Sequence, residues 1–72
     1  MLKTQYVDEM LLNQYVQRSG LKIGHVVEKL GISRQAYYKK TKGKIAFRAS
    51  EVYALCKMLD IPEEDEHKIF CF

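Results

Sequence analysis

The chain has 72 residues, of which 47% are hydrophobic and 29% are charged, a composition that indicates one small globular domain. A domain of this size buries only about 60% of the surface that its unfolded chain exposes, which leaves no room for a deep catalytic cleft. Residues 20–50 hold eight basic residues and one acidic residue (+7), whereas residues 51–72 hold two basic and six acidic residues (−4). The basic central segment favours a polyanionic partner, although a solvated lysine surface would give the same count.

The sequence predicts neither a membrane segment nor a secretory signal. No apolar run approaches the roughly 18 residues that a membrane span needs, and acidic residues interrupt the apolar N-terminus. The two cysteines, Cys56 and Cys71, have no CxxC spacing, and together with His25 and His67 they match no known zinc pattern. We expect a cytoplasmic protein with reduced, partly buried thiols, no metal and no cofactor.

The first two predicted helices each end at a glycine. The first spans about residues 4–18, with Thr4 as its N-cap, and a Ser-Gly pair follows it. The second, residues 23–30, has apolar residues at positions i, i+3, i+4 and i+7 and stops at Gly31. Gly24 lies inside this second helix and weakens it, so we expect another backbone to pass close by.

A short turn separates the second helix from the third. Only Gly31 and Ile32 precede Ser33, a good N-cap, and the third helix runs on to Gly43. Because the turn is so short, the two helices must cross steeply, with Ile32 filling the corner. We expect Tyr37 to face the core.

The last two predicted helices close the domain. The fourth spans about residues 49–59, and Glu51 reaches back to its start as in a capping box. We expect Lys40 to pair with Glu51 or to stay solvated. Pro62 begins a short fifth helix. Three apolar residues near the end of the chain complete the pattern: Ile69, Phe70 and Phe72. We expect them in the core rather than in a dimer contact. The sequence therefore predicts one all-α domain, residues 1–72, built as a compact bundle of about five short helices.

Two short helices that cross steeply about a tight turn form the unit with which helix-turn-helix proteins read DNA, here about residues 23–42. Arg34 and Gln35 lie in the first turn of its second helix, the part that reaches base edges in the major groove. Arginine suits the O6/N7 pair of guanine, and glutamine suits the N6/N7 pair of adenine. Lys39 lies one turn further on and reaches either a base or a phosphate. Three cations after this point are expected phosphate contacts: Lys42, Lys44 and Arg48.

Most of the chain, from about Leu11 to Phe72, resembles the lambda-repressor-like, Cro/CI-type helix-turn-helix domains of phages and bacteria. The resemblance is carried by SGLKIGHVVEKLGISRQAYYKKTKGK, by FRASEVYALCKMLDIP and by the terminal IFCF. It implies a five-helix bundle in the bacterial cytoplasm that binds double-stranded operator DNA, usually an inverted repeat, as a homodimer. It implies no small-molecule substrate.

The resemblance also implies a set of contact residues. The family's base contacts fall on Arg34, Gln35 and Lys39. Its phosphate contacts fall on Lys42, on the linker after it, and at the start of the second helix, where Lys22 lies. Two further residues complete the expected set: Tyr38, which is either a packing residue or a base contact, and Ser33, at a phosphate.

Two other classes of function stay open. A helix-turn-helix shell also serves as a protein-interaction module that binds a partner regulator or polymerase, and residues 34–42 would then be ordinary solvated surface. An enzyme is the least favoured class, because the sequence has no nucleophile–base pair, no phosphate-cradling glycine loop and no metal spacing. We therefore expect a sequence-specific transcriptional regulator, a phage-type repressor or Cro-like protein that places helix 33–42 in the operator major groove.

Overall fold

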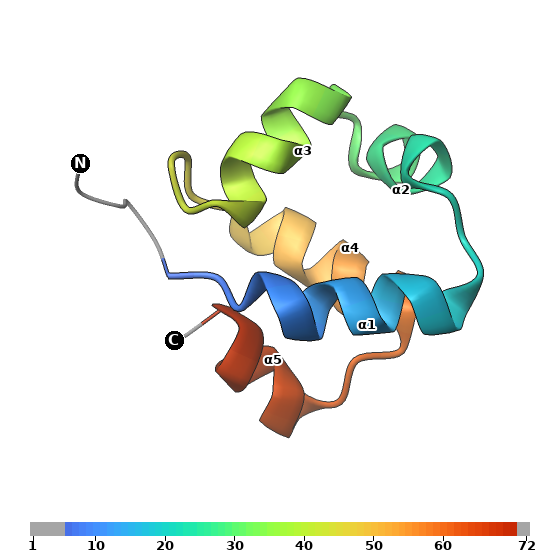
Figure 1. Cartoon of the computed structure of the whole chain (residues 1–72), viewed down its shortest axis with the longest axis vertical. Coiled ribbons are helices and arrows are strands. Elements are labelled where there is room, and N and C mark those ends of the chain that lie inside the picture. Colours follow the sequence, from blue (N-terminus) through green and yellow to red (C-terminus); the bar gives the residue numbers. More distant parts are fainter. Residues whose placement is uncertain (1–5, 71–72) are drawn as a thin grey trace.

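The computed structural model describes residues 6–70, which form five α-helices (Figure 1). The helices are α1 (Glu9–Ser19), α2 (Ile23–Leu30), α3 (Arg34–Thr41), α4 (Ala49–Leu59) and α5 (Glu63–Phe70). Residues 6–70 contain no strand, so the predicted all-α bundle of about five short helices is confirmed. Figure 1 shows α1 and α4 in the middle of the molecule, with α2 and α3 on one side of them and α5 on the other.

Helix α1 begins later than the sequence predicts. Its N-cap is Asp8, whose carboxylate accepts a hydrogen bond from the Leu11 N–H at 3.1 Å. Residues 6–8 are not helical. The Asp8 N–H donates instead to the Ile69 carbonyl at 2.8 Å, which ties this segment to the end of α5. The predicted start with Thr4 as N-cap is therefore wrong, and Thr4 itself lies outside the described residues.

The turn between α2 and α3 agrees with the prediction. Gly31 leaves α2 in the left-handed conformation, with φ of 72°. Ser33 caps α3 by accepting a hydrogen bond from the Ala36 N–H at 3.1 Å. Figure 1 shows α2 almost end-on and α3 lying across the view, so the two helices cross steeply. Ile32 sits half-buried between them and packs against the core.

Every helix contributes at least one fully buried side chain to the core. The largest of these are Leu12, Val26, Tyr37, Leu55, Ile69 and Phe70. Aromatic rings connect α3 to α5: the Tyr37 and Phe47 centroids lie 6.3 Å apart, and those of Phe47 and Phe70 lie 5.4 Å apart, both edge-to-face. Phe70 is therefore a core residue, as predicted, whereas Phe72 lies outside the described residues.

The start of α4 is held by Glu51, whose Oε1 accepts a hydrogen bond from the Arg48 N–H at 2.9 Å. This is the reach-back expected of a capping box. Within residues 6–70, no helix combines the length and the apolar character that crossing a membrane requires.

Candidate nucleic-acid interface

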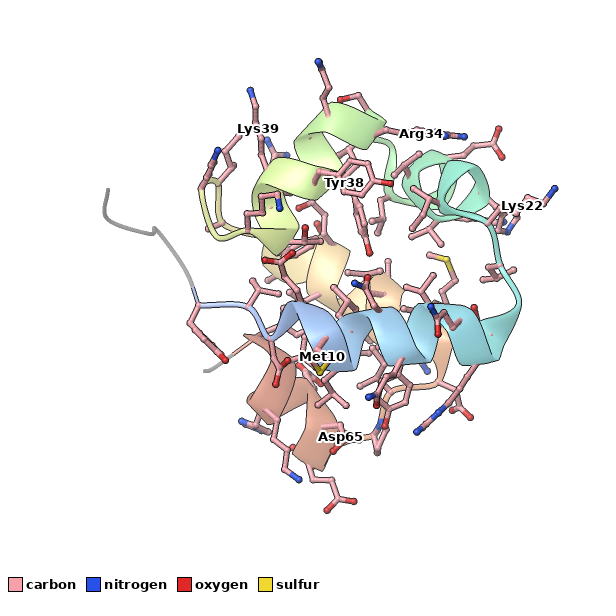
Figure 2. The ribbon with its side chains drawn as sticks, in the orientation of Figure 1. Met10, Lys22, Arg34, Tyr38, Lys39 and Asp65 are labelled. Atoms are coloured by element: carbon pink, nitrogen blue, oxygen red, sulfur yellow. The ribbon has the colours of Figure 1, made fainter. Side chains whose placement is uncertain are left out.

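The nine residues predicted to contact DNA are all exposed. They are Lys22, Ser33, Arg34, Gln35, Tyr38, Lys39, Lys42, Lys44 and Arg48. They come from three adjacent places in the fold: the N-cap of α2, the outward face and ends of α3, and the segment that connects α3 to α4. Figure 2 shows Arg34 and Lys39 at the two ends of α3 and Lys22 beside the start of α2, all at the end of the molecule away from α5.

The start of α3 is exposed and well formed. Ser33, as the N-cap, satisfies one N–H of the first turn, and Arg34 and Gln35 follow as the first two helical residues. Because both side chains are exposed, the first turn of α3 can approach a ligand without any change in the backbone. Tyr37, on the opposite face, is 1% exposed and holds α3 to the core.

Tyr38 packs against the core side of α3 and also remains exposed, so its role as a base contact stays a prediction. Its ring packs edge-to-face on Tyr37, with the centroids 5.7 Å apart. At the same time 48% of the residue is exposed, so the ring is accessible to a ligand on the outward face of α3.

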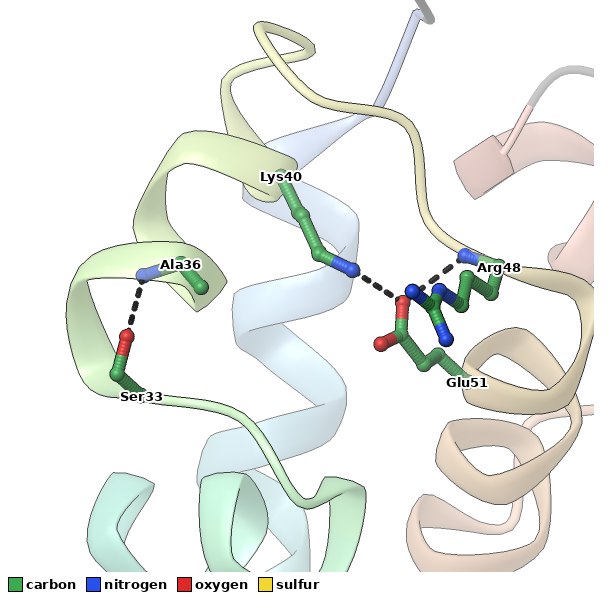
Figure 3. Close-up of polar contacts among 5 residues, drawn as sticks. All are labelled: Ser33, Ala36, Lys40, Arg48 and Glu51. Carbon is green, nitrogen blue, oxygen red and sulfur yellow. Dashed lines mark hydrogen bonds and ion pairs between the residues drawn. The ribbon is translucent and has the colours of Figure 1, made fainter.

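Lys40 is not part of this exposed surface (Figure 3). Its Nζ lies 2.6 Å from Oε1 of Glu51, and both side chains are only 8% exposed. The same Oε1 accepts the Arg48 N–H, so one carboxylate joins the last turn of α3 to the start of α4. Of the two expectations for Lys40, pairing with Glu51 is confirmed and a solvated side chain is wrong.

The environment of Glu51 favours its charged form. Burial alone would raise the pKa of its carboxyl, but the hydrogen bonds from Lys40 and from the Arg48 N–H, together with the two positive charges, lower the pKa below its ordinary value. Glu51 is therefore an ionised carboxylate at neutral pH, and its ion pair with Lys40 joins α3 to α4.

Gly24 has a different neighbour from the expected one. Among residues 6–70, no backbone atom of another element lies within 4 Å of the position that a Cβ at Gly24 would take; the closest atoms there belong to the guanidinium of Arg34, which lies across the start of α2. The expectation of a close backbone is therefore wrong. The spacing within the sequence carries no signal that would have paired Gly24 with Arg34, because a side chain from another helix makes the contact.

The predicted DNA contacts and the acidic first turn of α5 lie on opposite sides of the molecule. The first turn of α5 holds Glu63, Glu64, Asp65 and Glu66, and Figure 1 shows α5 on the far side of α1 from α3. Asp65 also accepts a hydrogen bond from the Tyr15 hydroxyl, a contact that no sequence pattern predicts. A polyanion would therefore be attracted to the α3 end and repelled from the α5 end.

Among the residues that the structure describes, a cysteine nucleophile and a metal site have little support. Burial, with the nearby Glu66 carboxylate, raises the pKa of the Cys56 thiol to about 11, so this cysteine is a poor nucleophile. Residues 6–70 hold no group of three or more His, Cys, Asp or Glu side chains that could bind a metal ion; Cys71 lies outside them.

No protein-family model, curated protein or solved structure matches the chain. The resemblance to Cro/CI-type domains therefore stays a prediction.

Proposed function

We propose that the protein is a sequence-specific DNA-binding transcriptional regulator of the lambda-repressor-like, Cro/CI type. The observation that carries the proposal is the start of α3: a capped helix end that exposes Arg34 and Gln35 beside a steep, tight turn. In this proposal α3 enters the major groove of a double-stranded operator, and its first turn meets the base edges. Occupation of the operator then blocks or modulates transcription.

Three kinds of contact have distinct roles in this proposal. Arg34 and Gln35 read bases by two-pronged hydrogen bonds, and Lys39 and Tyr38 extend the readout along α3. Phosphate contacts fix the position of the protein without reading sequence, and we assign them to Lys22, Ser33, Lys42, Lys44 and Arg48. Lys42 also lies 4.0 Å from Glu9, but both groups are largely exposed, and such a pair is weak enough for a phosphate to displace.

The protein binds as a homodimer in this proposal, with two copies of α3 on one face of the DNA. The half-sites of an inverted repeat are then about 34 Å apart, which is one turn of the double helix.

The test is selection from randomised duplexes at about 0.15 M salt, where purely electrostatic binding is already weak. We expect enrichment of one motif, in the form of an inverted repeat. Arg34→Ala and Gln35→Ala should each cost about 1–3 kcal/mol on the selected duplex and relax the preference at one base position. Gln14→Ala is the matched control, because Gln14 is an exposed glutamine of α1 outside the predicted contact set.

If the selection enriches no motif, the proposal is wrong. The same result would direct attention to the protein-interaction alternative, in which Arg34→Ala leaves DNA affinity unchanged.

A further inference from the structure

Gly24, the second residue of α2, has no conformational reason to be a glycine. Gly20 and Gly31 have φ of 74° and 72°, and a residue with a side chain would be strained there. Gly24, in contrast, lies within the α-helix Ile23–Leu30 and has no positive φ. Alanine is the better helix former at such a position, so the missing side chain calls for another explanation.

The Arg34 side chain fills the space that a side chain at position 24 would take. A Cβ atom added to Gly24 would lie 2.8 Å from Nη2 of Arg34 and 3.8 Å from its Cζ. The first distance is too short for a carbon and a nitrogen that are not bonded. Within residues 6–70, a Cβ added to Gly20 or Gly31 would meet no atom of another part of the chain within 4 Å. Figure 2 shows Arg34 reaching from the start of α3 over α2, in agreement with these distances.

Arg34 has a well-defined backbone, and its guanidinium lies at the start of α2. The Ser33 cap and the tight turn fix its backbone, and the bare backbone at Gly24 receives its guanidinium. Arginine has many side-chain rotamers, and ordering such a side chain only when a ligand arrives reduces affinity. Arg34 nevertheless stays exposed, so hydrogen-bond donors of its guanidinium remain accessible to a ligand.

We propose that Gly24 is a positioning residue. It restrains the Arg34 guanidinium so that α3 presents it toward DNA. This role rests on the proposed DNA binding. Gly24 itself touches no nucleic acid in this proposal. It acts through Arg34, and it explains why a glycine occupies a helical position of α2.

The substitution Gly24→Ala separates this role from a purely structural one. The added methyl group displaces only the far end of a flexible side chain, so the helix tolerates it. We expect the thermal midpoint of unfolding to stay unchanged or to rise by up to about 6 °C, because alanine is the better helix former. We expect the affinity for the selected duplex to fall about 2- to 10-fold, because Arg34 is no longer restrained. A merely structural role would move stability and affinity in the same direction.

A double-mutant cycle tests the coupling between the two residues. Duplex affinity is measured for the wild type, Gly24→Ala, Arg34→Ala and the double variant. We expect Gly24→Ala to weaken binding in the wild-type background and to have no further effect in the Arg34→Ala background. Asn13→Ala is the control for a gain in helix propensity alone, because Asn13 is exposed on α1; it should leave affinity unchanged.

Two results would overturn the positioning role while leaving DNA recognition intact. One is an unchanged affinity in Gly24→Ala, and the other is an equal loss from Gly24→Ala in both backgrounds, each with a wild type that selects a motif. If the wild type selects no sequence, the proposed function is wrong, and the positioning role is wrong with it. In the free protein, NMR contacts between the Gly24 Hα protons and the Arg34 side chain should be present, and their absence would also overturn the inference.

Discussion

Among the residues that the structure describes, one buried hydroxyl group has no hydrogen-bond partner, that of Tyr37. The residue as a whole is 1% exposed. Burial, with a smaller contribution from Tyr38, raises the pKa of Tyr37 to about 12, so the hydroxyl stays protonated. On folding, a buried hydroxyl of this kind loses its hydrogen bonds to water and gains none within the protein, which destabilises the folded state.

We therefore predict that Tyr37→Phe stabilises the protein. Removing the unpaired hydroxyl should raise the free energy of unfolding by about 1 kcal/mol, which corresponds to a thermal midpoint about 4–8 °C higher in a domain of this size. Tyr38→Phe is the matched control, because its ring is half exposed, and its effect should stay within about 0.5 kcal/mol. A less stable Tyr37→Phe variant would show that the hydroxyl has a partner in solution.

At the scale of elements, the decisive contact is the ion pair between Lys40 of α3 and Glu51 of α4. Both side chains are 8% exposed and their charged atoms lie 2.6 Å apart. A buried ion pair adds little net stability, because taking two charges out of water costs about as much as their attraction returns. Its clearest effect is on geometry: it fixes the last turn of α3 against the start of α4, between the expected contacts at Lys39 and Arg48.

We predict that breaking this pair is costly and that replacing it is not. Lys40→Met alone leaves a buried carboxylate without its cation and should cost about 3–5 kcal/mol, a large part of the stability of a domain this small. Adding Glu51→Leu should restore the free energy of unfolding to within about 2 kcal/mol of the wild type. Urea denaturation of the three variants measures these differences. The double variant would contradict the argument if it were no more stable than Lys40→Met.

The surface of α5 offers a matched comparison for this pair. Lys68 lies 3.8 Å from Asp65, and its side chain is 67% exposed. Because the lysine of this pair is exposed, the pair contributes little, so Lys68→Met should change the free energy of unfolding by less than about 0.5 kcal/mol. An effect as large as that of Lys40→Met would mean that burial is not what makes the Lys40–Glu51 pair sensitive.

The elements also show which parts of the structure the sequence can predict. The α2–α3 turn was predictable because local chemistry determines it: Gly31 supplies the left-handed residue and Ser33 the cap. The start of α1 was not, because a contact with Ile69, distant in the sequence, holds Asp8 outside the helix. The Arg34–Gly24 contact was unpredictable for the same reason, since two helices must first be placed before the side chain can cross between them.

At the scale of the whole molecule, charge is divided between two ends. The expected phosphate contacts cluster around α3, and the acidic first turn of α5 lies on the opposite side of the bundle. Because its charge is unevenly distributed, the domain would be oriented by the field of a polyanion, although its net charge is only +3. The composition predicted the excess of basic residues in the central segment, but only the fold shows that the acidic first turn of α5 lies away from them.

This arrangement predicts how the proposed DNA binding should depend on salt. Four of the expected phosphate contacts are cations, Lys22, Lys42, Lys44 and Arg48, and each neutralised phosphate contributes about −0.9 to the slope of log affinity against log salt concentration. We predict a slope of about −4 for a bound monomer and about −7 for a homodimer on an inverted repeat. Titrations of the selected duplex at several salt concentrations measure the slope. Lys42→Ala should make it less negative by about one per protomer on every duplex, whereas Lys68→Ala, on α5, should leave it unchanged. An equal effect of the two substitutions would mean that net charge, and not the surface around α3, determines binding.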